Sequence, residues 1–293
     1  MARRMSPSQI RSQLRRAEQK QRQAISKYNS DVRKYNSDRK RAVDSYNREV
    51  RAQNARVRAN RQRLRREISR LSSSTTTSRY VVYRESVHTL QQSFSRIETA
   101  ADTGTWNAGE ELLDLSEGET ANSVGVLNAL LAPPEEIGAR EDDGALQETS
   151  ITNELSVIDP DLEARWRGAL FALNPRNPDA ARHFCTSSRE LLTAILELHA
   201  PDAAVQAASD RYERTLDGGV SRRARIRYCL ERRGTYDAEL EDFVENDLDN
   251  VIALFRDFND GAHGSAGRFD LAQLGAIKTR VEDAVHFLHR IVR

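Results

Sequence analysis

A seven-residue repeat dominates the first quarter of the chain. Between Pro7 and the serine-threonine run at 72–78 there is neither proline nor glycine, and strong helix formers, chiefly Arg, Gln, Lys and Ala, fill the sequence. Apolar residues recur every seven positions, at Val43, Val50, Val57, Leu64 and Leu71. A heptad pattern sustained over this length predicts one long helix of the coiled-coil type.

The second position of the heptad seam is mostly polar. Tyr46, Gln53 and Asn60 each follow an apolar seam residue by three positions, and Tyr28 and Tyr35 follow Ile25 and Val32 in the same way. The eleven-residue step from Val32 to Val43 is a stutter of four residues. Polar seam residues specify register and reduce stability. We therefore expect this helix to need a partner helix or a ligand to order fully.

Charge is divided unequally along the chain. Residues 1–72 hold 22 Lys and Arg against 6 Asp and Glu, a net charge of +16, whereas the remainder carries −15. Such asymmetry suggests that the basic part meets nucleic acid or an acidic partner. Two interpretations stay open for residues 1–71: a solvated dimerisation rod, or a rod that also lies along nucleic acid and releases counterions.

The rest of the chain is predicted to be helical throughout. Residues 72–78 read as a linker, 79–131 as a helical adaptor with short helices at about 106–115 and 119–131, and 132–150 as an acidic linker with two prolines. Residues 151–293 show about five helical patterns. No run alternates for long enough to form a sheet. The predicted fold class is all-α: a long basic coiled-coil helix, a helical adaptor and a C-terminal helical bundle.

Several helix ends are marked in the C-terminal part. Asn177 reads as an N-cap with Pro178 at the first helical position, and Asp202 and Asp270 can cap later helices. Gly234 ends the basic stretch at 221–233.

Sequence signals for export and membrane insertion are missing. No apolar run approaches the roughly 18 residues of a membrane span, and the basic start MARRMSPSQI leads into no apolar stretch. Cys185 and Cys229 lack the spacing of a metal site. We expect a cytoplasmic protein with two reduced thiols and no cofactor or metal.

Arg256 and His263 form the candidate catalytic pair. Six residues separate them. We expect Arg256 in the last turn of a helix and a turn of the chain at Asn259-Asp260-Gly261, while Gly261, Gly264 and Gly267 keep the surroundings small. Histidine can serve as general acid or base near neutral pH, and arginine can stabilise charge on a phosphate. With the substrate's own 2′-hydroxyl as nucleophile, this pair would cleave RNA without a metal. The alternative is structural: His263 packs at a helix end and Arg256 pairs with a nearby carboxylate.

A second pair has the same spacing. Arg176 and His183 flank the start of a predicted helix, on which Arg182 and Arg189 also lie. We expect this helix to line the same cleft as the Arg256–His263 pair. The predicted nucleic-acid contacts combine these residues with the basic stretch at 221–233 and are Arg176, Arg182, His183, Arg189, Arg222, Arg223 and Arg225.

The sequence segments around these residues resemble those of a known family. NPDAARHFCTSSRELLTAILE and FRDFNDGAHGSAGRFDLAQLGAIKTRVEDAVHFLHRI look like the predicted nuclease domain associated with prokaryotic PIWI proteins, and the repeated YN words look like the leader of such proteins. The C-terminal part also resembles the HEPN ribonucleases, whose motif is Arg, four to six residues, then His. In that superfamily the site forms across a dimer. Asp257 matches the polar residue that often follows the Arg there, and so becomes a third candidate catalytic residue.

The resemblance implies one function, and two alternative functions stay open. It implies a metal-independent RNA endonuclease in bacterial defence against phages or plasmids, which acts as a homo-oligomer, takes RNA rather than DNA, and works with a defence-system partner protein away from membranes. One alternative is a non-catalytic coiled-coil assembly subunit of a defence complex. Another is a metal-dependent DNA nuclease that uses the carboxylates of ELEDFVENDLD; a solvated helix face explains these acids more simply.

Overall fold

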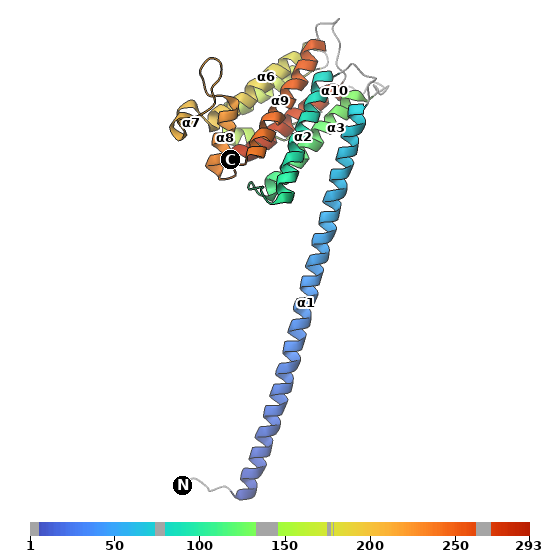
Figure 1. Ribbon diagram of the computed structural model, residues 1–293, viewed down its shortest axis with the longest axis vertical. Coiled ribbons are helices and arrows are strands. Elements are labelled where there is room, and N and C mark those ends of the chain that lie inside the picture. Colours follow the sequence, from blue (N-terminus) through green and yellow to red (C-terminus); the bar gives the residue numbers. More distant parts are fainter. Residues whose placement is uncertain (1–5, 74–79, 133–145, 175–176, 178, 262–270) are drawn as a thin grey trace. The chain divides into compact units, whose positions relative to one another are not determined.

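The computed structural model describes residues 6–73, 80–132, 146–174, 177, 179–261 and 271–293 (Figure 1). These residues form helices and turns, and the only β-type pairing among them is one isolated bridge between Arg214 and Val220. The fold is all-α. Its helices are α1 (Pro7–Ser73), α2 (Val81–Thr103), α3 (Glu110–Leu131), α4 (Thr152–Ile158), α5 (Pro160–Ala172), α6 (Ala180–His199), α7 (Asp202–Ala208), α8 (Arg222–Arg233), α9 (Ala238–Gly261) and α10 (Leu271–Val292).

The chain divides into two units, Met1–Arg63 and Leu64–Arg293. The described residues of the first unit belong almost entirely to α1, as the long run of helix formers predicts. Its apolar seam is solvent-exposed in the single chain: Ile25 is 53% exposed and Val43 is 51% exposed. Tyr28, Tyr35 and Tyr46 on the polar side of the seam are exposed as well. Burial of this seam therefore requires a second surface.

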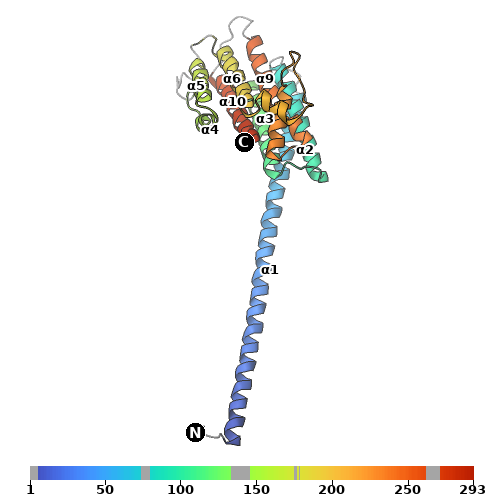
Figure 2. The ribbon, with the colours of Figure 1, turned by 90° about the vertical axis from the view of Figure 1, so that its left-hand side faces the viewer.

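Helix α9 lies at the centre of the second unit. It contacts α2, α3, α6, α8 and α10, and its contact with α2 is the most extensive in the fold. The two helices lie side by side in Figure 1, while α5 packs on α6 and α3 packs on α10 (Figure 2). Buried apolar residues such as Phe94 and Phe243, whose rings meet edge to face, join the segment 79–131 to the segment 151–293. Both segments thus share one hydrophobic core.

The last turns of α1 belong to the second unit. Ile68 is buried there, and Arg65 donates from Nη2 to Glu98 Oε2 over 2.5 Å. Burial of one isoleucine side chain contributes about 1.5–3 kcal/mol. This contact fixes the C-terminal end of α1 to α2 independently of the exposed seam further along the helix.

A buried ionic cluster ties four helices together. Arg280 of α10 is fully buried and donates to Glu119 Oε1 of α3, to Asp247 Oδ1 of α9 over 2.6 Å and to Asn250 Oδ1 over 2.9 Å. Asn250 donates in turn to Ser86 Oγ of α2 over 2.8 Å. Desolvation raises the pKa of Glu119 and of Asp247. One guanidinium thus faces two buried carboxyl groups, and burial favours the protonated form of each.

Helix α3 is one helix where two short ones were expected. It runs without a break from Glu110 to Leu131 through Gly118. Leu112, Leu127 and Leu130 are buried on one side of it. The core contacts of this stripe outweigh the weak helix preference of the glycine, serine and threonine residues at its centre.

Helix boundaries elsewhere differ by a few residues from the expected ones. Helix α6 begins at Ala180, and the Asn177 side chain accepts a hydrogen bond from the Asp179 amide over 3.0 Å. Helix α9 continues through the Asn-Asp-Gly stretch to Gly261, where a turn was expected. The expected cap at Asp270 lies outside the described residues. In the described part of residues 151–293, two seven-residue helices, α4 and α7, accompany the five longer helices.

Two chain-wide expectations concern thiols and membranes. Cys185 and Cys229 are free and buried, and burial raises the pKa of Cys185 to about 12 and that of Cys229 to about 11. Such thiols are inert at neutral pH. Across the described residues, no helix has both the length and the apolar character needed to cross a bilayer.

Candidate functional site

The C-terminal part of α9 carries two of the three predicted catalytic residues. Arg256 is exposed there, one turn before the helix ends at Gly261. His263 lies outside the described residues. The structure therefore gives the position of Arg256, and its pairing with His263 stays a prediction.

Asp257 has a structural partner. Its Oδ2 accepts a hydrogen bond from the backbone amide of Tyr83 over 2.7 Å, in the first turn of α2. The residue that precedes α2, Tyr80, has left-handed backbone with φ 54° and supplies no side-chain cap. A carboxylate at a helix N-terminus satisfies a free amide and favours the helix dipole. Asp257 thus holds the end of α9 against α2, next to the exposed Arg256.

The start of α6 brings Arg182 and His183 to one carboxylate. Both side chains are exposed and pair with Asp179, with His183 Nε2 lying 3.2 Å from Asp179 Oδ2. Arg176 lies outside the described residues. Arg189, two turns further along α6, is exposed and stands at the edge of a cavity.

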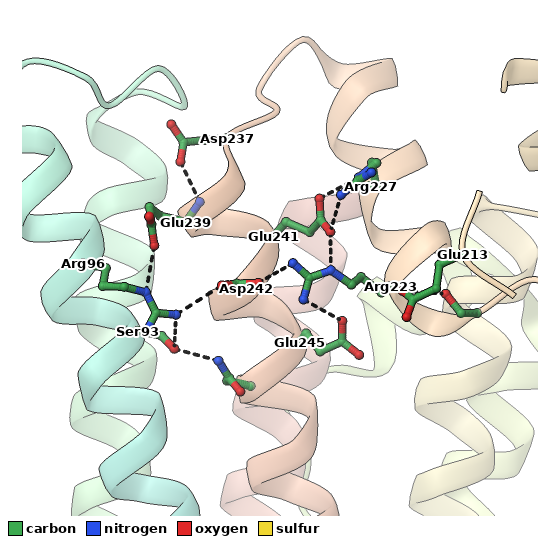
Figure 3. Close-up of polar contacts among 12 residues, drawn as sticks. Ser93, Arg96, Glu213, Arg223, Arg227, Asp237, Glu239, Glu241, Asp242 and Glu245 are labelled. Atoms are coloured by element: carbon green, nitrogen blue, oxygen red, sulfur yellow. Dashed lines mark hydrogen bonds and ion pairs between the residues drawn. The ribbon is translucent and has the colours of Figure 1, made fainter. Parts of the chain in front are cut away.

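The basic stretch of α8 faces the acidic side of α9. Figure 3 shows Arg223 of α8 among three carboxylates of α9. Its Nε lies 2.6 Å from Oε1 of Glu241, a side chain with no solvent exposure, and its Nη2 pairs with Asp242. Arg227 also binds Glu241, with Nε at 2.8 Å from Oε2. The hydrogen bond to Glu241 raises the pKa of Arg227.

The same row of charges extends to α2. Arg96 of α2 binds Glu239 over 2.8 Å and Asp242 over 3.3 Å (Figure 3). Asp242 therefore lies between arginines of α2 and α8. The alternation of charge neutralises the acidic face of α9, which was expected to be solvated. These carboxylates and arginines hold three helices together.

Arg222 and Arg225 of α8 are also held by carboxylates. Arg222 pairs with Asp249 over 2.6 Å and with Glu245 over 3.2 Å. Burial raises the pKa of Glu245, against the opposite effect of Arg222. Arg225 pairs with Asp202 and donates to the Ala200 carbonyl at the end of α6. Competing carboxylates reduce the positive potential that these arginines offer to a phosphate.

Three predicted nucleic-acid contacts meet at one cavity. Arg189, Arg222 and Arg225 line a space of about 250 Å³ between α6, α8 and α9. The remaining lining is largely apolar and consists of Leu192, Thr193, Leu196, Glu197, Thr215, Val220, Leu248 and Ile252. An apolar floor with arginines at its edge suits an amphipathic guest.

Histidines other than His263 have defined surroundings. His289 is buried and His199 is partly buried, and desolvation lowers the pKa of both rings. His286 pairs with Glu154 over 2.7 Å, and His88 lies on the exposed side of α2 beside Gln92. Within the described ranges, no three His, Cys, Asp or Glu side chains gather in a group that could hold a metal ion.

Two features of the site region were not foreseen from the sequence. The first is the buried cluster around Arg280, whose only sequence signal is a charged residue in the apolar register of α10. The second is the hairpin-like loop at 213–221, which provides two residues of the cavity. The Asp-Gly pair in its sequence LDGGV is a common signal for a tight turn between extended segments.

Comparisons with known proteins give one match. A family profile described as predicted pPIWI-associating nuclease matches residues 155–288, which run from α4 to α10. Neither the curated proteins nor the solved structures yield a match. The matched region contains α8, α9, the cavity between α6, α8 and α9, and both members of the Arg256–His263 pair. Over residues 155–288, the chain is similar to the family of predicted pPIWI-associating nucleases.

Proposed function

We propose that this protein is a metal-independent RNA endonuclease of a HEPN-like type that serves bacterial defence against phages or plasmids. The observation that carries the proposal is the family match over 155–288, because it spans the Arg256–His263 pair. The exposure of Arg256 on α9 supports it, since a catalytic arginine must reach a phosphate. A pPIWI protein is the proposed partner, on the strength of the family description alone.

The proposed chemistry uses Arg256, His263 and the 2′-hydroxyl group of the RNA. His263 accepts the proton of the ribose 2′-hydroxyl, the 2′-oxygen attacks phosphorus, and the bond to the 5′-oxygen breaks. The leaving 5′-oxygen takes a proton from the His263 of a second subunit or from water. Arg256 stabilises the added negative charge on the phosphate oxygens. Asp257 acts as a positioning residue, because it fixes the end of α9 to α2.

The proposed path of the RNA uses the exposed basic residues. Arg182, His183 and Arg189 of α6 are exposed, and Arg176 precedes them in the chain. Arg222, Arg223 and Arg225 bind carboxylates and would contact RNA only by exchanging those partners. We therefore assign phosphate contact mainly to α6 and a structural role to the arginines of α8.

The test is cleavage of labelled RNA and of DNA of the same sequence by the purified full-length chain in EDTA. We expect RNA cleavage that His263→Ala and Arg256→Ala each reduce at least about a hundredfold, the usual range for general acid-base groups. Matched controls are His88→Ala on α2 and Arg165→Ala on α5, both exposed positions outside the proposed site. Activity that depends on added Mg²⁺, or that survives His263→Ala unchanged, contradicts the proposal.

A second candidate function rests on the exposed seam of α1. Apolar heptad residues with about half of their surface in solvent favour an assembly subunit that pairs through a coiled coil. In this alternative the C-terminal helices bind nucleic acid or a partner without cleaving. Absence of cleavage together with loss of assembly in seam variants would favour it over the nuclease.

A further inference from the structure

The loop between α7 and α8 presents a leucine to solvent. Thr215 and Gly218 close a tight turn, with the Gly218 amide donating to the Thr215 carbonyl over 2.9 Å. Leu216 and Asp217 occupy the two central positions of this turn. The side chain of Leu216 is fully exposed. Its place in a turn is unusual, because such positions normally carry polar residues, glycine or proline.

Several contacts hold this loop in one shape. The Thr215 amide donates to the Gly219 carbonyl over 2.9 Å, and the Ser221 amide donates to the Glu213 carbonyl over 3.1 Å. Gly218 has φ +85°, a left-handed conformation that suits glycine. The loop is thus a built structure whose tip carries an apolar side chain. Ordering that tip gives the single chain no hydrophobic burial.

The cavity between α6, α8 and α9 lies beside this loop. Thr215 and Val220, at the base of the turn, form part of its lining, so the loop is one wall of the cavity. Because Leu216 is fully exposed, its side chain does not fill the cavity of its own chain. The floor of the cavity consists of leucine and isoleucine side chains from α6 and α9, namely Leu192, Leu196, Leu248 and Ile252.

Charge at the two features is complementary. Asp217 follows Leu216 at the tip of the turn and is exposed. Arg189 at the cavity edge is exposed, and the described residues give it no ion pair of its own. A guest with an apolar side chain beside a carboxylate would therefore satisfy both the floor and the edge of this cavity.

We propose that the cavity receives Leu216 from a second copy of this chain, while Asp217 of that copy pairs with Arg189. The tip and the cavity are neighbours on one surface, as a two-fold symmetric interface requires, because each copy must offer both halves of the contact. A two-fold axis beside the loop makes the exchange reciprocal. This contact belongs to the unit Leu64–Arg293 and is separate from the exposed seam of α1.

Cross-linking between two differently substituted chains tests the contact directly. One full-length chain carries Leu216→Cys, and the other carries Thr193→Cys at the cavity edge. The native cysteines are buried and remain unreactive. We expect a disulfide between the two chains after mild oxidation. The control replaces Thr193→Cys with Thr99→Cys, an exposed threonine of α2. Equal cross-linking of both mixtures, or none in the first, overturns the proposal.

The affinity of the association provides an independent measurement. Sedimentation of full-length chains carrying Val50→Lys, which puts a charge into the seam of α1, isolates the contact of the second unit. Adding Leu216→Asp should weaken self-association at least about tenfold, since it removes two reciprocal leucine contacts. Val157→Asp, at an exposed apolar position of α4, should leave it unchanged. An unchanged dissociation constant for Leu216→Asp sinks the proposal, whether or not the protein cleaves RNA.

Discussion

At the scale of single residues, Arg280 shows how the core depends on charge. Its guanidinium binds the buried carboxylates of Glu119 and Asp247, and removing one partner of such a group leaves an uncompensated charge in the core. Arg280→Met should therefore lower the free energy of unfolding by about 3–5 kcal/mol in urea denaturation at neutral pH. An effect under 1 kcal/mol would mean that the cluster is hydrated and contributes little.

Glu119→Gln makes a different prediction, about pH. Burial raises the pKa of Glu119 above its ordinary value of 4.5, so the folded state holds a proton that the unfolded state releases as pH rises. The free energy of unfolding consequently falls as pH increases from 4.5 upward. Glutamine does not titrate. As pH increases from 5 to 8, the free energy of unfolding of the variant should therefore rise by at least about 1 kcal/mol relative to that of the wild type. Glu110→Gln, exposed at the start of α3, is the control, and parallel curves for wild type and Glu119→Gln refute the prediction.

The helix on which a residue lies could be predicted from the sequence, whereas its long-range contact partners could not. The sequence placed Arg256 near the end of α9, and the structure has it exposed on that helix. It also drew attention to Asp257, but its hydrogen bond to Tyr83 joins residues 174 positions apart. Arg280 and Glu119 are separated by 161 positions. No local pattern encodes such contacts, because they exist only once the helices have packed.

At the scale of helices, the sequence predicts α8 and α9 individually but does not predict the contact between them. The stretch SRRARIRYCLERR predicts a basic helix ended by Gly234, and the structure has α8 ending with that glycine as its left-handed cap. The acidic character of α9 is equally plain in the sequence. What helical periodicity cannot supply is that the two faces meet, so that Arg223 binds Glu241 and Asp242. The merging of two expected helices into α3 has the same origin in tertiary packing.

The pairing of α8 with α9 predicts that two arginine variants behave differently. Arg182→Ala, at an exposed position of α6, should weaken RNA binding and lower the slope of log affinity against log salt by about one, as expected for the loss of one phosphate contact. Arg223→Ala should leave that slope unchanged and reduce the free energy of unfolding by about 1–3 kcal/mol, because the buried Glu241 loses a partner. Fluorescence anisotropy across salt concentrations and urea denaturation measure the two effects. The reverse assignment of effects would show that α8, and not α6, carries the RNA.

At the scale of the whole molecule, opposite charge and exposed apolar surface divide the chain. Residues 1–72 have a net charge of +16 and the remainder −15, so the two parts differ in the partners they attract. The basic part also bears the exposed seam, in which Val43 and Val50 alternate with polar residues. A partner for this helix must cover apolar residues and tolerate positive charge, which a second copy or an acidic helix can do when salt or RNA screens the repulsion.

Seam variants decide whether α1 mediates assembly. Val50→Lys places a charge in the predicted interface of every pair of helices, whereas Ala55→Lys puts the same charge at an exposed position between seam residues. In sedimentation of the full-length chain with and without RNA, Val50→Lys should raise the dissociation constant of the oligomer at least about tenfold relative to Ala55→Lys. Higher salt should strengthen self-association of the wild type, because each helix repels its copy. If both variants associate like the wild type, the basic helix serves RNA or another protein, and the oligomer must be built by the second unit alone.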